Sequence, residues 1–206
     1  MIVIESLREK WVEGNRPEDL AEKVLENPEL LDEVINGLSS EEKRIRGGCA
    51  EIISLISEKI PERVLPYIDT ILEGLDSGSP IRRWEAICTL GNLSQIERSG
   101  RISAQISRIA ENLSTESVVL RLHTVRALGK IGRNNPSTSK EVFDLLIGSA
   151  KYFKEKDVGF VAEALTYLSG YPDLHPAMME FAQSLLKSKN RTVLSKAKKL
   201  ITLLDR

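Results

Sequence analysis

One cysteine and two histidines are the side chains in this sequence best suited to nucleophilic catalysis or metal binding. Cys88 would need a nearby base or cation to form a thiolate, and His123 follows it along the chain. The sequence shows neither an acid to orient His123 nor a donor for an oxyanion. His175 belongs to no HExxH motif, and P-loop, GxGxxG and GxSxG patterns are absent. The sequence therefore predicts a non-enzymatic protein with no catalytic residue, no metal and no cofactor.

Basic residues suggest a second kind of chemistry, the binding of phosphate. Arg126, Lys130 and Arg133 are spaced i, i+4, i+7, which places them on one stripe of a helix. The ordinary interpretation of such a stripe is a solvated helix face. Arg83 and Arg121 are two further candidates for phosphate contacts.

Trp84 is the residue that best fits protein recognition. It is flanked by two arginines and a glutamate, and it lies off the apolar stripe that begins at Ile87. Trp and Arg are favoured as anchors of protein interfaces. Cys88, one turn later, faces the same way. The alternative is that Trp84 fills a gap between helix layers, because Trp side chains are usually mostly buried.

An internal repeat must position these residues. The sequence LGNL at 90–93 returns as LGKI at 128–131, which is 38 residues later. Weaker copies lie around Ile53, Leu168 and Ile201. The apolar residues of each copy recur at i, i+3 and i+6, the period of one helix face. Small residues that would let a neighbouring helix approach closely are Cys49, Ala86, Thr124, Ala164 and Ala197.

A second set of helices is predicted between these copies, and several of them begin with proline. No stretch alternates apolar and polar residues for long, so no strand is expected. A single helix pair cannot bury its apolar stripe, whereas stacked pairs can. The sequence therefore predicts one all-α domain over residues 1–206, a solenoid of about five helix pairs. The pairs are expected at approximately 17–59, 61–95, 100–132, 138–170 and 174–205.

The pattern resembles that of HEAT repeats, whose second helix commonly reads Val-Arg-x-x-Ala-x-x-Ala-Leu-Gly-x-Ile. The matching residues are Asp76, Pro80, Arg83, Ala86, Leu90, Gly91 and Leu93, and then Arg121, Ala127, Leu128, Gly129 and Ile131. The resemblance spans about residues 17–204 and implies a right-handed α-α superhelix with the second helices on its concave side. It also implies that Arg83 and Arg121 bond within or between repeats. The fourth copy departs from the pattern, with Val161 in place of this arginine.

The side chains of the second helices that packing does not use form the expected binding surface. Extended concave surfaces of repeat proteins suit a peptide, a helix or a folded partner, so we expect a protein partner and no small-molecule substrate. The predicted contact residues are Trp84, Cys88, Asn92, His123, Arg126, Lys130 and Thr166.

The charge distribution bears on the alternative partners. Net charge is −1, but residues 1–75 carry nine Lys/Arg and seventeen Asp/Glu, whereas residues 76–206 carry twenty and thirteen. One alternative is a nucleic-acid binding or repair protein resembling the HEAT-like alkylpurine DNA glycosylases. The acidic N-terminal third disfavours it, because a DNA groove is basic along its length. Another alternative is a structural subunit that assembles head to tail through ends of opposite charge.

The remaining sequence features concern the compartment. The N-terminus has early acidic residues and no long apolar run, unlike a signal peptide. No segment reaches the roughly 18 apolar residues of a membrane span. The two cysteines form no CxxC motif. We therefore expect a cytoplasmic protein that does not enter membranes.

Overall fold

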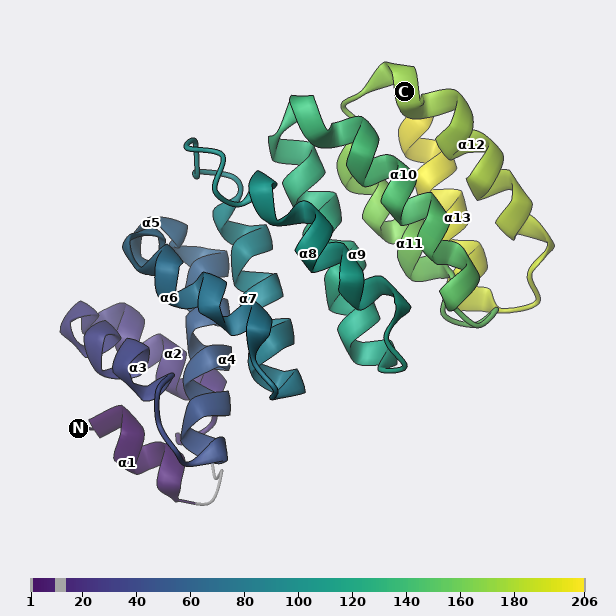
Figure 1. Ribbon diagram of the computed structural model, residues 1–206. Helices are drawn as coiled ribbons and strands as arrows, with labels where there is room; N and C mark the ends of the chain where they lie inside the picture. The colour runs from purple at the N-terminus through teal and green to yellow at the C-terminus, as the bar shows by residue number, and fades with distance from the viewer. Residues whose placement is uncertain (1, 10–13, 206) are drawn as a thin grey trace. The chain divides into compact units, whose positions relative to one another are not determined.

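The computed structural model describes residues 2–9 and 14–205, and all regular elements in these ranges are helical (Figure 1). The all-α prediction is confirmed. The chain divides into two compact units, residues 1–96 and 97–206. The first unit contains the first two predicted helix pairs, and the second unit contains the other three.

The first unit packs short helices against two long ones, α4 and α7, which also pack against each other. Its helices are α1 (Ile2–Arg8), α2 (Pro17–Glu26), α3 (Leu31–Gly37), α4 (Lys43–Lys59), α5 (Pro61–Val64), α6 (Ile68–Glu73) and α7 (Pro80–Leu93). The predicted helix at 61–75 is interrupted by a 3₁₀ turn at Leu65–Tyr67. The reason is Pro66, which has no N–H for an α-helical hydrogen bond. Helix α1 precedes the predicted repeats and buries Leu7 against Gly48.

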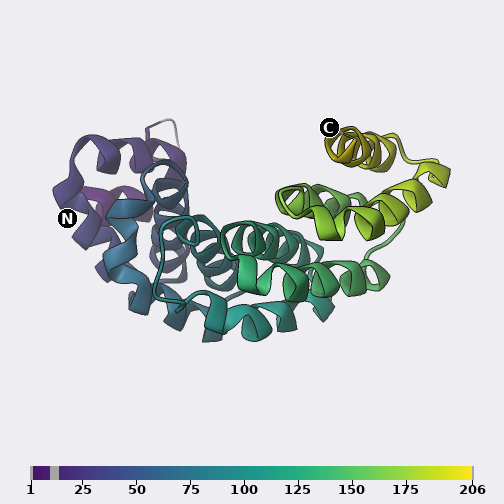
Figure 2. The ribbon, with the colours of Figure 1, turned by 90° about the horizontal axis from the view of Figure 1, so that it is seen from above.

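The second unit repeats one arrangement three times. Its α-helices are α8 (Ile106–Ala110), α9 (Val118–Asn134), α10 (Ser139–Ser149), α11 (Gly159–Leu165), α12 (His175–Ser184) and α13 (Arg191–Leu204). A 3₁₀ turn, Thr166–Leu168, continues α11. Helices α8, α10 and α12 are the first helices of their pairs, and α9, α11 and α13 are the second helices. Contacts join α9 to α11 and α11 to α13, so the second helices form one layer (Figure 2).

The core of each unit is aliphatic and follows the apolar period of the sequence. Ile87, Leu90 and Leu93 of α7 are fully buried in the first unit. Val125 and Leu128 of α9 are equally buried in the second unit. The i, i+3, i+6 stripe of each copy is therefore the face that the second helix turns toward its core.

Arginines at equivalent places fasten the loop before three of the second helices. Arg46 donates to the Ser40 carbonyl at 2.6 Å, and Arg83 donates to the Ser77 carbonyl at 2.7 Å. Arg121 likewise donates to the carbonyl of Thr115. Each arginine donates to the carbonyl of the residue six positions earlier, so these guanidinium groups stabilise the loop that leads into their own helix. In the fifth repeat the second helix, α13, is capped instead by Asn190, whose side chain accepts hydrogen bonds from two backbone N–H groups.

Small residues allow the backbones of neighbouring helices to approach closely. A Cβ on Gly37 would overlap the Cys49 sulfur, and one on Gly74 would lie 2.7 Å from the Ala86 Cβ. In the second unit a Cβ on Gly129 would lie 2.7 Å from the Ala164 carbonyl oxygen. The Ala164 carbonyl is part of the backbone and the Ala86 Cβ is fixed to the backbone, so neither atom can yield as the end of a flexible side chain can. The helix spacing therefore depends on these positions staying small.

A single methyl group should accordingly distort the second unit. We expect Gly129→Ala to lower the free energy of unfolding by about 1–3 kcal/mol through overpacking against α11. Gly148→Ala on α10 is the matched control, because a Cβ there meets nothing within 4 Å. That control should gain up to about 1 kcal/mol from helix propensity. Urea denaturation followed by circular dichroism measures both, and equal effects of the two substitutions would contradict the close contact.

Candidate binding surface

In the first unit, an aromatic ring and carboxylates lie together on the second helices. Trp84 and Glu85 of α7 and Glu51 of α4 are all half-buried. The Trp84 indole N–H donates to Glu85 Oε1 at 2.5 Å. We call Glu51 and Glu85 the acidic pair. Trp84 is thus neither in the core nor fully exposed.

The acidic pair is held in an environment that disfavours its charge. Burial, followed by the negative charges of Glu85 and Glu18, raises the pKa of Glu51 from 4.5 to about 7. Burial also raises the pKa of Glu85, although hydrogen bonds from Trp84 and Ser54 partly oppose that effect. A cation placed beside these carboxylates would relieve their repulsion.

Two other predicted contact residues of α7 differ in their surroundings. Asn92 is buried, and its amide donates to Ser57 Oγ of α4 at 2.9 Å. The structure therefore corrects the expectation that Asn92 is left over from packing, since this side chain joins two second helices. Cys88 is half-buried one turn after Trp84. Cys49 is fully buried, and burial followed by Glu33 raises its pKa to about 12, which keeps it a neutral thiol.

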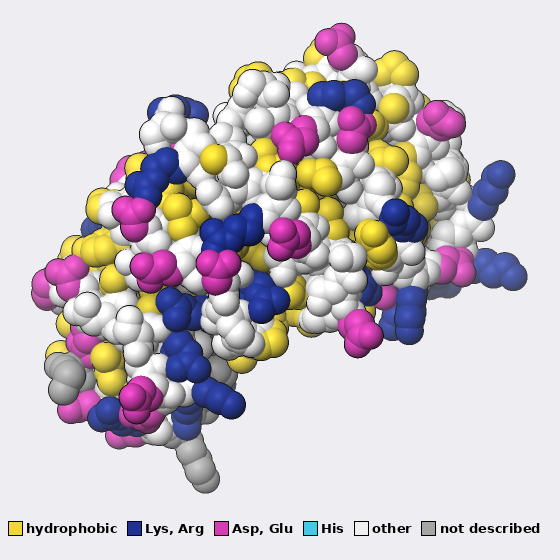
Figure 3. Space-filling view, viewed as in Figure 1, with side chains coloured by type: hydrophobic (Ala, Val, Ile, Leu, Met, Phe, Trp, Pro, Cys, Tyr) yellow, Lys and Arg dark blue, Asp and Glu magenta, His cyan; other side chains and the backbone are white. Residues whose placement is uncertain are grey.

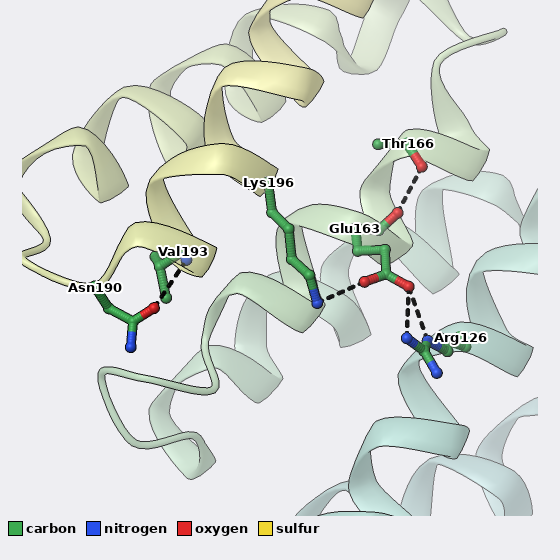
Figure 4. A network of polar contacts seen from close by, with 6 residues as sticks. All are labelled: Arg126, Glu163, Thr166, Asn190, Val193 and Lys196. Atoms are coloured by element: carbon green, nitrogen blue, oxygen red, sulfur yellow. Dashed lines mark hydrogen bonds and ion pairs between the residues drawn. The ribbon is translucent and has the colours of Figure 1, made fainter.

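In the second unit, an ionic network crosses the layer of second helices (Figure 4). Glu163 of α11 lies between Arg126 of α9 and Lys196 of α13. The Arg126 Nε donates to Glu163 Oε1 at 2.8 Å, and Lys196 Nζ lies 2.6 Å from Glu163 Oε2. Burial opposes ionisation of Glu163, but the hydrogen bonds and charges of Lys196 and Arg126 outweigh it and lower its pKa.

An aromatic ring supports the same two cations. The Arg126 guanidinium carbon lies 5.5 Å from the centre of the Phe160 ring, and Lys196 Nζ lies 3.5 Å from it. Both are within the range of cation–π attraction. Arg126 was predicted as a partner contact, but the structure shows it engaged with Glu163 and Phe160. The network therefore fastens three neighbouring helices.

Three more predicted contact residues surround this network. His123 is half-buried one turn before Arg126, and burial followed by the Arg126 charge lowers its pKa, which favours neutral imidazole. Lys130 is half-buried one turn after Arg126. The Thr166 hydroxyl donates to the Glu163 carbonyl at 2.6 Å. His123 and Cys88 lie in different units.

A groove of about 620 Å³ opens where the second helices of this unit end. Its lining residues are Arg133, Thr166, Tyr167, Ser169, Gly170, Tyr171, Lys199 and Leu203, and we call it the basic groove. Its volume is typical of ligand pockets. The Tyr171 hydroxyl donates to the carbonyls of Gly132, at 2.9 Å, and Arg133, at 2.8 Å, which fixes the ring. Of these residues, Thr166 was predicted as a partner contact and Arg133 as part of a basic stripe.

The two units have opposite charge. Residues 1–96 carry eleven Lys/Arg and nineteen Asp/Glu, a net of −8, and residues 97–206 carry eighteen and eleven, a net of +7. On the face that carries the first helices, acidic, basic and apolar side chains are interspersed (Figure 3). The carboxylates of the acidic pair and the cations of the basic groove instead lie on second helices or at their ends.

Two further properties concern the described residues alone. No three His, Cys, Asp or Glu side chains among them converge to hold a metal ion. Within residues 2–9 and 14–205, every helix is too short or too polar to span a bilayer.

Comparison with known proteins gives the fold. No family model matches the sequence, and no curated protein is similar to it in sequence. A designed armadillo repeat protein, solved in complex with the peptide (KR)4, is similar in structure, with a TM-score of 0.69 at 14% identity over 98% of both chains. This chain has an armadillo-like helical-repeat fold.

Other engineered proteins give the same result. One has a TM-score of 0.69 at 17% identity, covering 98% of this chain and 97% of that chain. Armadillo repeat proteins designed for modular peptide recognition give 0.65 at 12% identity over 98% of both chains. The predicted helical-repeat solenoid is confirmed, and the likeness at these identities concerns the fold alone.

The ionic network should contribute to stability in a pH-dependent manner. We expect Glu163→Gln to lower the free energy of unfolding at pH 7 by about 1–2 kcal/mol, because Arg126 and Lys196 lose their shared counterion. The pKa of Glu163 is lower in the folded chain, so its contribution is present above 4.5 and is lost as pH falls through the folded value. Denaturant titrations at pH 7 and pH 3 measure this. Asp144→Asn, which breaks the exposed ion pair with Lys140, should change stability by less than about 0.5 kcal/mol.

The contribution of the acidic pair to stability should depend on pH in the opposite sense to that of Glu163. The pKa of Glu51 is raised on folding, so the folded state loses stability as pH rises from 4.5 to about 7. We expect the change in the free energy of unfolding caused by Glu51→Gln to be more favourable at pH 8 than at pH 4.5. After allowance for the partial exposure of Glu51, the difference should be about 1–2 kcal/mol. Glu58→Gln, at an exposed position of the same helix, is the control. A pH-independent effect of Glu51→Gln would contradict the repulsion.

Proposed function

We propose that this chain is a non-enzymatic, cytoplasmic repeat scaffold that binds a protein partner through its second helices. The observation that carries the proposal is the group formed by Trp84, Glu85 and Glu51 on α7 and α4. It combines an aromatic ring with half-buried carboxylates whose charge is poorly compensated. Perturbed pKa values cluster at binding sites, which supports a binding role for this group.

The chemistry of this group favours a cationic side chain of the partner. A Lys or Arg residue would neutralise the acidic pair and stack on the Trp84 ring. The similar designed armadillo repeat protein was solved with a peptide of alternating Lys and Arg, which supports a basic peptide as the probe. In this chain, Trp84 and Cys88 would contact the partner from the first unit, and His123, Lys130 and Thr166 from the second. Asn92 and Arg126 would support those contacts by holding the helices.

A binding experiment tests this function. We expect labelled (KR)4 to bind the wild-type chain and to bind Trp84→Ala and Glu85→Gln at least about tenfold more weakly, because one substitution removes the ring and the other a charge. Fluorescence anisotropy measures the affinities, and Glu58→Gln is the control. Circular dichroism should show unchanged helicity. A large fall in melting temperature of Trp84→Ala, with binding intact, would assign Trp84 to packing.

The pH dependence provides an independent check. Protons and the peptide compete for Glu51, so the peptide should bind about tenfold more tightly at pH 8 than at pH 5.5. In Glu51→Gln this difference should shrink. Binding that is equally tight at both pH values would place the peptide away from the acidic pair.

A further inference from the structure

The cations around the second helices of the second unit fall into two groups. Arg126 and Lys196 share the Glu163 carboxylate as their counterion and lie over the Phe160 ring. Arg133 and Lys199 are exposed and line the basic groove. Among the described residues, neither of these two side chains makes a hydrogen bond or an ion pair, and no Asp or Glu lines the groove. The groove thus has uncompensated positive charge on two helices, α9 and α13.

We propose that the basic groove binds an acidic segment of the protein partner, with an Asp or Glu carboxylate held between Arg133 and Lys199. The inference rests on the proposed function, because it takes the occupant to be a peptide segment. It adds a second contact site and the sign of its charge, which is opposite to that required at the acidic pair. A guanidinium and an ammonium group together provide the charged donors that a carboxylate accepts.

The other lining residues suit a peptide chain. Leu203 and the Tyr167 ring give the groove an apolar part, as ligand pockets usually have. Tyr171 is held in place by its hydroxyl, so this wall is already formed. Gly170 is exposed and has no atom within 4 Å of where a Cβ would lie, so space remains beside it for a backbone.

Charge also favours an acidic peptide over a nucleic acid. The net charge of +7 on residues 97–206 would attract an acidic segment from a distance. A sugar–phosphate backbone that followed the second helices would meet the carboxylate of Glu163 between α9 and α13. It would also find Arg126 and Lys196 already paired, whereas non-specific nucleic-acid binding needs a continuous basic track.

Binding of the octapeptide (ED)4 to the whole chain tests the proposal by fluorescence anisotropy. We expect wild type to bind labelled (ED)4, and Arg133→Glu/Lys199→Glu to bind it at least about tenfold more weakly. The matched control is Lys187→Glu/Lys198→Glu, which changes the net charge equally at two exposed positions outside the groove. It should stay within about threefold of wild type. Equal losses in both double variants would overturn the proposal, since the general field would then account for binding.

A second variant blocks the groove without changing charge. Gly170→Trp places a large ring where a Cβ meets no neighbour, and we expect it to weaken (ED)4 binding about tenfold while thermal melting stays unchanged. Binding of (ED)4 to this variant as tightly as to wild type would overturn the assigned location.

Competitors separate the possible anions. Unlabelled (dT)12 that displaces (ED)4 at lower concentration than unlabelled (ED)4 itself would overturn the proposal in favour of nucleic acid. Displacement by inorganic phosphate at micromolar concentration would overturn it in favour of a phosphate site. Measuring (KR)4 on the same proteins distinguishes the two claims. If the wild-type chain binds (KR)4 but fails to bind (ED)4, this inference is refuted, whereas if it binds (ED)4 but fails to bind (KR)4, the site at Trp84 is refuted.

Discussion

The close approach of neighbouring helices at small residues is the constraint on which the other features depend. Gly37 lies against Cys49, Gly74 against Ala86, and Gly129 against the Ala164 carbonyl, at distances that exclude any larger side chain. Helices this close leave little room for side chains between them. In the second unit this contact joins two second helices, α9 and α11, and the side chains beside it also meet, as Arg126 and Glu163 do.

Polar residues on these helices divide into those that hold neighbours and those that remain available. Asn92 joins α7 to α4, and Arg126, Glu163 and Lys196 join three helices. Arg46, Arg83 and Arg121, in the first turns of their second helices, bind the loops that precede those helices. A charged or polar side chain outside the apolar stripe can thus serve as a cross-link between repeats. Available charge is concentrated in smaller areas, such as the basic groove.

The two units use the same residue type in opposite ways. Glu163 is surrounded by cations and has a lowered pKa, whereas Glu51 faces other carboxylates and has a raised one. The first arrangement satisfies the carboxylate within the protein, and the second leaves its repulsion to be relieved from outside. Since the units also differ in net charge, each would select a partner segment of the opposite sign.

The sequence by itself determined the repeat, the helices and the core, because the apolar period of residues such as Ile87, Leu90 and Leu93 is a local property. The resemblance to HEAT repeats implied that Arg83 and Arg121 bond within or between repeats. Only the tertiary structure decided that Asn92 is buried and that Arg126 is paired with Glu163. It also placed Glu85 where its charge raises the pKa of Glu51. It also decided that Arg133 and Lys199 line one groove. These facts depend on which side chains of successive repeats meet, and residues more than thirty positions apart meet only after the helices have packed.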